Sequence, residues 1–222
     1  MKPNAKHDDI SLSALARCAR EAGVTVPEAA LPGLAEYLQL LCRWNKAMNL
    51  VGAHHWRDAM QRLVADSFHL ATFLDGLPLP EDPLCWDLGS GAGLPAIPLR
   101  MAWQRGTCWL VEAREKRALF LSMVLARVPL PGTHVFRGRV EHFFPKQARK
   151  ADCITSRAFM PWPQLLELVA PHLADDGIVV ILAREEPPAA GDIDGWELVG
   201  SFAYTADNVH RWFWALRRRA EG

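Results

Sequence analysis

The sequence predicts an α/β protein with a mostly parallel sheet, an antiparallel C-terminal hairpin and an N-terminal helical extension. Three observations predict this class. Residues 1–76 show no strand-like alternation, residues 84–183 alternate short apolar runs with helix-like segments, and residues 196–218 hold two strand-like runs around a turn. Strands separated by short helices imply βαβ crossovers, and therefore a parallel sheet covered on both faces.

The helical extension is predicted from apolar side chains at helical spacing. Such stripes indicate helices that bury one face, and capping residues and glycines mark their ends. A Pro-rich segment over 78–83 separates this extension, residues 1–76, from a second part, residues 77–222. The expected helices run from a cap at Asp9 to Gly23, from Pro27 or Pro32 to Trp44, and from Trp56 to Leu74.

The second part alternates between two kinds of segment. Strands are expected at 84–88, 107–111, 134–136, 152–156 and 177–183. Helices are expected at 94–104, 114–127, 139–144 and 163–173. The closing hairpin is expected to pair 196–204 with 210–218 around the turn residues 206–208.

A glycine-rich loop follows the first expected strand. Asp87 ends that strand, and Gly89, Gly91 and Gly93 follow at alternate positions before a helix-like run. A dinucleotide fingerprint would need glycine or alanine at position 94, where the chain has Leu94, and a P-loop would need a lysine that is absent here. The remaining pattern, acidic-x-G-x-G-x-G, is that of Rossmann-like methyltransferases that bind S-adenosylmethionine. The alternative is an ordinary glycine-rich turn between a strand and a helix.

Other candidate site residues lie where expected strands end, because open α/β sheets bind ligands at the carboxyl ends of their strands. Glu112 ends the second strand, and its carboxylate can accept both ribose hydroxyls of an adenosyl group or cap the next helix. After the third strand, Val140 and Glu141 are candidates for reading the adenine edge, and Arg139 faces outward; a solvated helix start is the alternative.

The fourth strand ends in an arginine followed by aromatic residues and prolines. Arg157 is a candidate partner for the cofactor carboxylate or a substrate phosphate. Phe159 or Trp162 could stack on a base, or pack against the helical extension.

Three polar residues of the extension are further candidate site residues. Asn45 and Lys46 lie near a helix end, where the plain interpretation is a C-cap with a basic last turn. Arg62 lies on the third helix, where most charged side chains form a solvated face.

Composition narrows the class of protein without identifying a partner. The chain has 222 residues, 25 basic and 25 acidic, so its net charge gives no sign of nucleic acid. The five cysteines are scattered and form no metal-ligand spacing, and no apolar run is long enough for a membrane span or a signal peptide. A cytoplasmic protein without a bound metal is expected.

The motifs together resemble the RsmG proteins, also called glucose-inhibited division protein B. The resemblance covers roughly residues 38–185. It rests on R-W-N-K-x-x-N-L at 43–50, D-S at 66–67, D-L-G-S-G-A-G-L-P-A-I-P-L at 87–99, K-R-x-x-F-L at 116–121, R-V-E at 139–141 and S-R-A-F at 156–159.

The resemblance implies methyl transfer from S-adenosylmethionine to N7 of a guanine in small-subunit (16S) ribosomal RNA, on a Rossmann-like methyltransferase fold. By position, the resemblance assigns the family's cofactor contacts to Gly89, Leu94, Val140, Glu141 and Arg157, with Glu112 as the acidic residue at a strand end. The expected cofactor-binding residues are Asp87, Gly89, Gly91, Leu94, Glu112, Val140, Glu141 and Arg157. The expected RNA-contacting residues are Asn45, Lys46, Arg62, Arg139 and Phe159.

Some positions depart from the family pattern. Leu63 stands where the family usually has histidine, Ala183 and Arg184 stand where it often has Lys-Gly, and Ala96 replaces a glycine. A guanine N7 carries a free lone pair, so no catalytic acid or base is expected. Two alternatives stay open: a cofactor-binding ribosome-assembly or RNA-binding module without turnover, and a methyltransferase of another RNA or of a small molecule.

Overall fold

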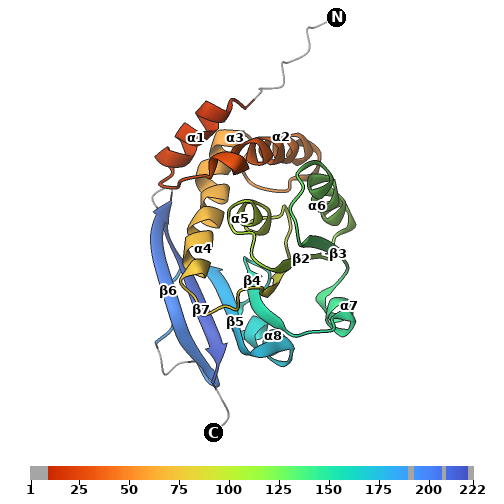
Figure 1. Cartoon of the computed structure of the whole chain (residues 1–222), viewed down its shortest axis with the longest axis vertical. Helices are drawn as coiled ribbons and strands as arrows, with labels where there is room; N and C mark the ends of the chain where they lie inside the picture. The colour runs from red at the N-terminus through yellow and green to blue at the C-terminus, as the bar shows by residue number, and fades with distance from the viewer. Residues whose placement is uncertain (1–9, 190–192, 207–208, 220–222) are drawn as a thin grey trace, which may run out of the picture.

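The computed structural model describes residues 10–189, 193–206 and 209–219. Within these residues, seven strands form one sheet in the order β3-β2-β1-β4-β5-β7-β6 (Figure 1). The first five of these strands are parallel, and β7 pairs antiparallel with both β5 and β6. The strands are β1 Leu84–Leu88, β2 Thr107–Glu112, β3 Thr133–Arg137, β4 Ala151–Ser156, β5 Leu173–Ala183, β6 Trp196–Ala206 and β7 Val209–Arg218.

Helices precede the sheet and connect its parallel strands. They are α1 Leu12–Glu21, α2 Leu31–Met48, α3 Trp56–Ala59, α4 Ala65–Asp75, α5 Ala96–Ala102, α6 Glu115–Arg127, α7 Val140–Phe143 and α8 Trp162–Val169. A π-helical segment, Met60–Val64, joins α3 to α4, so residues 56–75 form one continuous helix. The sheet therefore has the βαβ connections that the sequence predicts.

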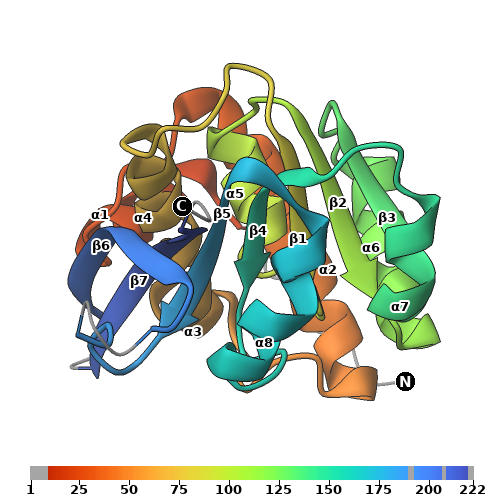
Figure 2. The same ribbon diagram turned by 90° about the horizontal axis from the view of Figure 1, so that it is seen from below.

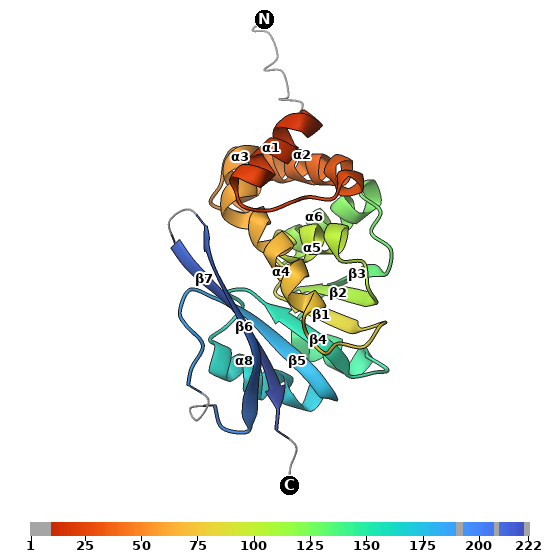
Figure 3. The same ribbon diagram turned by 60° about the vertical axis from the view of Figure 1, so that its left-hand side comes forward.

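The two faces of the sheet bury different sets of side chains. Along β1, Cys85 joins the core formed with α1, α2 and α4–α6, whereas Trp86 and Leu88 join the core formed with α7 and α8. Figure 3 shows α1–α6 on one side of the sheet and α8 on the other. Figure 2, seen from below, shows β3, β2, β1, β4 and β5 side by side. Both faces are covered, as a parallel sheet requires.

The structure confirms the predicted fold class and adjusts several boundaries. The expected cap Asp9 lies outside the described residues; α1 begins after Ser11, whose hydroxyl accepts the Ala14 N–H at 3.1 Å. Helix α2 continues past Trp44 to Met48 and ends at Asn49, which takes a left-handed conformation with φ +47°. Strand β5 begins at Leu173 because its first residues already pair with β4. The division at residues 76 and 77 stays a prediction.

Candidate functional site

The loop between β1 and α5 requires glycine for two reasons. Gly89, Gly91 and Gly93 have φ angles of +73°, +58° and +79°, which other residues rarely adopt. In addition, a Cβ on Gly89 would lie 2.5 Å from Cδ2 of Phe159. From α2, the buried Tyr37 hydroxyl donates to the Ala92 carbonyl at 2.9 Å, so the helical extension helps to hold the loop.

Glu112, at the end of β2, joins the glycine loop to the next helix. Its Oε2 accepts the Gly91 N–H at 2.8 Å, and its Oε1 accepts the Arg114 N–H at 2.7 Å. The side chain is buried, but each carboxylate oxygen can accept a second hydrogen bond. Capping and ligand binding are therefore compatible roles for this carboxylate.

A first cavity lies at the ends of β1, β2 and β3 and is called here the loop cavity. Its volume is about 610 Å³, which is in the range of small-molecule sites. Three arginines and one aromatic residue, Phe159, are among its lining residues. The loop cavity is lined by Gly89, Val111, Glu112, Ala113, Arg114, Arg117, Gly138, Arg139, Val140, Glu141, Ala158, Phe159 and Met160.

A second cavity, of about 720 Å³, lies between β4, β5, α8 and the C-terminal hairpin and is called the hairpin cavity. The π-helical segment and the start of α4 complete its wall. The residues that line it are Arg62, Leu63, Asp66, Ser156, Arg157, Ala158, Met160, Pro161, Trp162, Pro163, Leu165, Ile181, Leu182, Ala183, Arg184, Glu185, Tyr204, Arg211 and Trp212.

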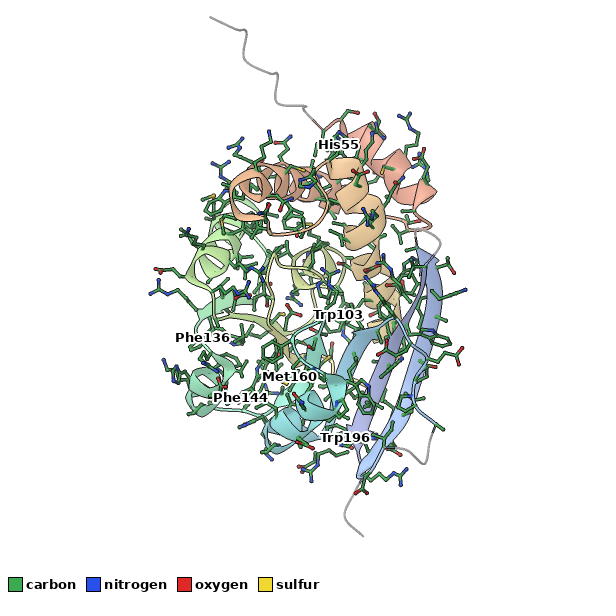
Figure 4. All side chains as sticks on the ribbon, turned by 180° about the vertical axis from the view of Figure 1, so that it is seen from behind. His55, Trp103, Phe136, Phe144, Met160 and Trp196 are labelled. Carbon is green, nitrogen blue, oxygen red and sulfur yellow. The ribbon has the colours of Figure 1, made fainter. Side chains whose placement is uncertain are left out.

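The two cavities meet at Ala158 and Met160, which line both. Ala158 has a φ of +54°, an uncommon conformation for a residue with a Cβ and one that often marks a functional site. Figure 4 shows Met160 between the α7 side of the molecule, where Phe144 is labelled, and the hairpin side, where Trp196 is labelled. The two cavities are therefore neighbours that share these two residues in their walls.

The buried Asp87 lies beneath the glycine loop. Its Oδ1 accepts the Thr155 hydroxyl at 2.9 Å, and its Oδ2 has no hydrogen-bond partner among the described residues. Burial raises the pKa of Asp87, while the Ser90 and Thr155 hydroxyls act in the opposite direction. The carboxyl group thus ties the end of β1 to β4 through Thr155.

The predicted cofactor-binding residues divide into two groups. Gly89, Glu112, Val140 and Glu141 line the loop cavity. The other predicted residues do not line it. Gly91 contributes its N–H to Glu112, Asp87 and Leu94 are buried, and Arg157 lines the hairpin cavity.

The predicted RNA-contacting residues are also dispersed. Arg139 and Phe159 line the loop cavity, Arg62 lines the hairpin cavity, and Lys46 is exposed on α2. Asn45 is buried: its amide donates to the Ala53 carbonyl at 2.8 Å and its oxygen accepts the Val51 N–H at 2.9 Å. This geometry favours a structural role for Asn45, which ties the end of α2 to the following loop.

The sequence interpretation missed the contribution of the hairpin. Tyr204, Arg211 and Trp212 line the hairpin cavity although they lie far from every motif in the sequence. Arg211 donates to both carboxylate oxygens of Asp66, at 2.6 and 2.5 Å. Arg211 is one of several basic residues of β7, with His210, Arg217 and Arg218, so the sequence gives no signal that singles it out or indicates its partner.

Comparison with known proteins identifies the family of this chain. Residues 30–188 match the GidB family, described as rRNA small subunit methyltransferase G. The chain belongs to the GidB family. It is 52% identical over 209 residues to Ribosomal RNA small subunit methyltransferase G of Nitratidesulfovibrio vulgaris (strain DP4), covering 94% of this chain and 95% of that protein. The protein of the same name from Lawsonia intracellularis (strain PHE/MN1-00) is 43% identical over 94% of this chain and 96% of its own length.

Solved structures agree with the fold of this GidB family member. The precorrin-6y C5,15-methyltransferase of Geobacter metallireducens GS-15 superposes with a TM-score of 0.51 at 14% identity, covering 68% of this chain and 89% of that one. This likeness shows the methyltransferase fold and nothing finer. Across the described residues, no helix is both long and apolar enough to cross a membrane.

Proposed function

We propose that the protein transfers a methyl group from S-adenosylmethionine to N7 of a guanine in small-subunit (16S) ribosomal RNA. The observation that carries this proposal is the pair of cavities that meet at Ala158 and Met160. One is built around a glycine loop and a carboxylate, and the other is lined by aromatic and cationic side chains. Family membership supports the same reaction class. Since the proposed substrate is a ribosomal RNA, the expected place of action is the cytoplasm.

The loop cavity fits an adenosyl cofactor. Gly89 lines this cavity, and the remaining acceptor capacity of Glu112 suits two ribose hydroxyls. Val140 and Glu141 line the side on which the adenine edge is expected. When bound, S-adenosylmethionine supplies an activated methyl group.

The hairpin cavity fits the acceptor nucleotide. Trp162 and Trp212 offer indole rings for stacking, and base stacking on aromatic side chains is a common mode of RNA recognition. Arg62 and Arg184 at the same cavity suit phosphate groups. A base held here would face the loop cavity across Ala158.

The protein's contribution to this reaction is alignment. Guanine N7 has a free lone pair, so no side chain has to remove a proton. Residues at the junction hold the base edge toward the loop cavity and exclude water, and orientation of this kind accounts for a large share of catalysis in many enzymes. Binding residues, rather than one acid or base, are therefore expected to dominate the effects of mutation.

Transfer of a radiolabelled methyl group to small ribosomal subunits that lack their own modification tests the proposal. The wild-type protein is compared with Gly89→Asp, which fills the loop, and with Gly23→Asp as a control. Gly23 has a similar φ of +77°, but nothing lies within 4 Å of a Cβ built there. Cleavage of the labelled RNA at 7-methylguanine then locates the product.

Label on a guanine N7 that Gly89→Asp loses and Gly23→Asp keeps is the expected result. Binding of S-adenosylhomocysteine without any transfer to particles or RNA would contradict the proposal. That outcome would favour an assembly or RNA-binding module without turnover. Label at another position of the RNA would support methyltransferase activity and contradict methylation at guanine N7.

A further inference from the structure

Asp66 is a buried carboxylate that faces two arginines from distant parts of the chain. It lies at the start of α4 and is 3% exposed. Arg211, on β7, donates from Nη1 to both of its oxygens and to the Arg62 carbonyl at 2.8 Å. Arg157, at the end of β4, has its Nη1 3.6 Å from Asp66 Oδ2. That distance allows electrostatic attraction but exceeds that of a hydrogen bond.

The two arginines thus contact Asp66 in different ways. Arg211 is fixed by charge-assisted hydrogen bonds, and its side chain is 19% exposed. The Arg157 side chain makes no hydrogen bond with any of the described residues, and it is 25% exposed at the hairpin cavity. Among these three side chains, Asp66 carries one negative charge and the arginines carry two positive charges; the buried Asp87 also interacts electrostatically with Arg157.

We propose that Arg211 is a positioning residue which, by binding Asp66, leaves the Arg157 guanidinium available to hold an anionic pair of ligand oxygens where the two cavities meet. The inference rests on the proposed function, because the ligand is either the cofactor or the RNA. A carboxylate and a phosphate present the same paired oxygens to a guanidinium. The sources are the carboxylate of the cofactor's amino-acid part and an RNA phosphate.

The physical reason lies in the cost of an uncompensated buried charge. If Arg211 were absent, the buried Asp66 would lose the guanidinium that donates to both of its oxygens. The closest remaining cation is Arg157, and its Nη1 needs to move by less than 1 Å to reach hydrogen-bond distance from the present 3.6 Å. The carboxylate would then capture Arg157 and withdraw it from the ligand.

The test is a mutant cycle that uses the full chain and two binding measurements. Arg211→Ala removes the neutralising cation, and Arg211→Gln is a second variant that keeps most of the side chain's length. Each is combined with Asp66→Asn, which removes the carboxylate charge. Arg217→Ala is the matched control, since it breaks another ion pair of the same hairpin, Arg217 to Glu197 at 2.6 Å, away from both cavities.

Calorimetry with S-adenosylhomocysteine and with 5′-methylthioadenosine, which lacks the amino-acid carboxylate, tests whether Arg157 holds the cofactor carboxylate. Filter binding to unmodified small ribosomal subunits tests whether Arg157 holds an RNA phosphate. Thermal unfolding confirms that each variant is folded.

The expected result is a loss of affinity of about tenfold in Arg211→Ala or Arg211→Gln, matching that of Arg157→Ala. Addition of Asp66→Asn restores the affinity to near that of the wild type, and Arg217→Ala leaves it unchanged. A loss seen with S-adenosylhomocysteine and not with 5′-methylthioadenosine assigns the cofactor carboxylate. A loss confined to the subunits assigns an RNA phosphate.

Two outcomes would overturn the inference. Folded Arg211 variants that bind both ligands as the wild type does would show that Asp66 does not capture Arg157. A loss that Asp66→Asn fails to restore would show that Arg211 acts as a simple tether of the hairpin. If the wild-type protein binds no S-adenosylhomocysteine, the proposed function fails and this inference fails with it.

Discussion

Gly89 combines two constraints at one residue: a positive φ and direct contact with Phe159. We expect Gly89→Ala to cost about 1–3 kcal/mol of stability and to weaken S-adenosylhomocysteine binding at least about tenfold, because the new methyl group strains the backbone and displaces the ring. Gly23→Ala, where the φ is similar but the space is open, is expected to cost about 1 kcal/mol and to leave binding unchanged. Urea unfolding and calorimetry measure both effects. Equal losses in the two variants would show that contact with Phe159 is unimportant.

Glu112 supports the loop through two backbone N–H groups, and a neutral amide cannot replace it. In Glu112→Gln the side-chain NH₂ faces one of these donors, so one buried N–H loses its acceptor. We expect a loss of about 1–3 kcal/mol in unfolding free energy and weaker S-adenosylhomocysteine binding. Glu115→Gln, in an exposed pair with Arg137, is the control, with an expected change within about 0.5 kcal/mol. A Glu112→Gln protein with wild-type stability would contradict the assigned role.

At the scale of an element, Arg100 holds the end of α5 to two loops. Its buried guanidinium donates to the carbonyls of Trp103, Arg105, Gly106 and Pro131, among other acceptors. We expect Arg100→Leu to destabilise the protein by at least about 3 kcal/mol, because several buried carbonyls lose their donor together.

Urea unfolding is the measurement for Arg100→Leu as well. Arg127→Leu is its control, since Arg127 forms a surface pair with Glu36 and the expected change is within about 0.5 kcal/mol. A mild effect of Arg100→Leu would mean that water replaces the guanidinium at these carbonyls.

His69 couples α4 to the hairpin in a way that depends on pH. Its ring lies 4.6 Å from that of Tyr204, and burial lowers the pKa of His69 below its usual value. A lowered pKa in the folded state means that the neutral ring stabilises the fold above about pH 6.5, and that this contribution is lost as the pH falls through the folded-state pKa.

We therefore expect the wild-type protein to lose more stability than His69→Phe between about pH 7 and pH 5. Urea unfolding across this range measures the difference. His54→Gln, at an exposed position, is the control. Parallel pH profiles for the wild type and His69→Phe would refute the coupling.

At the scale of the whole molecule, the helical extension and the sheet share one core. A single cluster of buried side chains reaches from Ile10 and Leu15 in the extension to Phe213 and Ala215 in the hairpin. We expect a fragment of residues 77–222 to lack a cooperative unfolding transition, because removal of the extension exposes the apolar face of the sheet. Thermal unfolding and near-UV circular dichroism check this against the full chain. A cooperative transition in the fragment would show that residues 77–222 fold on their own.

The sequence by itself determined the fold class, the glycine loop and the carboxylate that follows the second strand. These features are local, because each depends on residues that are close together in the sequence: the alternation of strands and helices, the spacing of glycines and the residues at strand ends. The tertiary structure decided which residues meet at the site. Arg211 lies 145 positions from Asp66 in the chain, and their ion pair arises because the hairpin joins the sheet beside β5 and packs against α4. Placement of Arg157 beside Asp66 likewise depends on packing between distant segments, which no local pattern encodes.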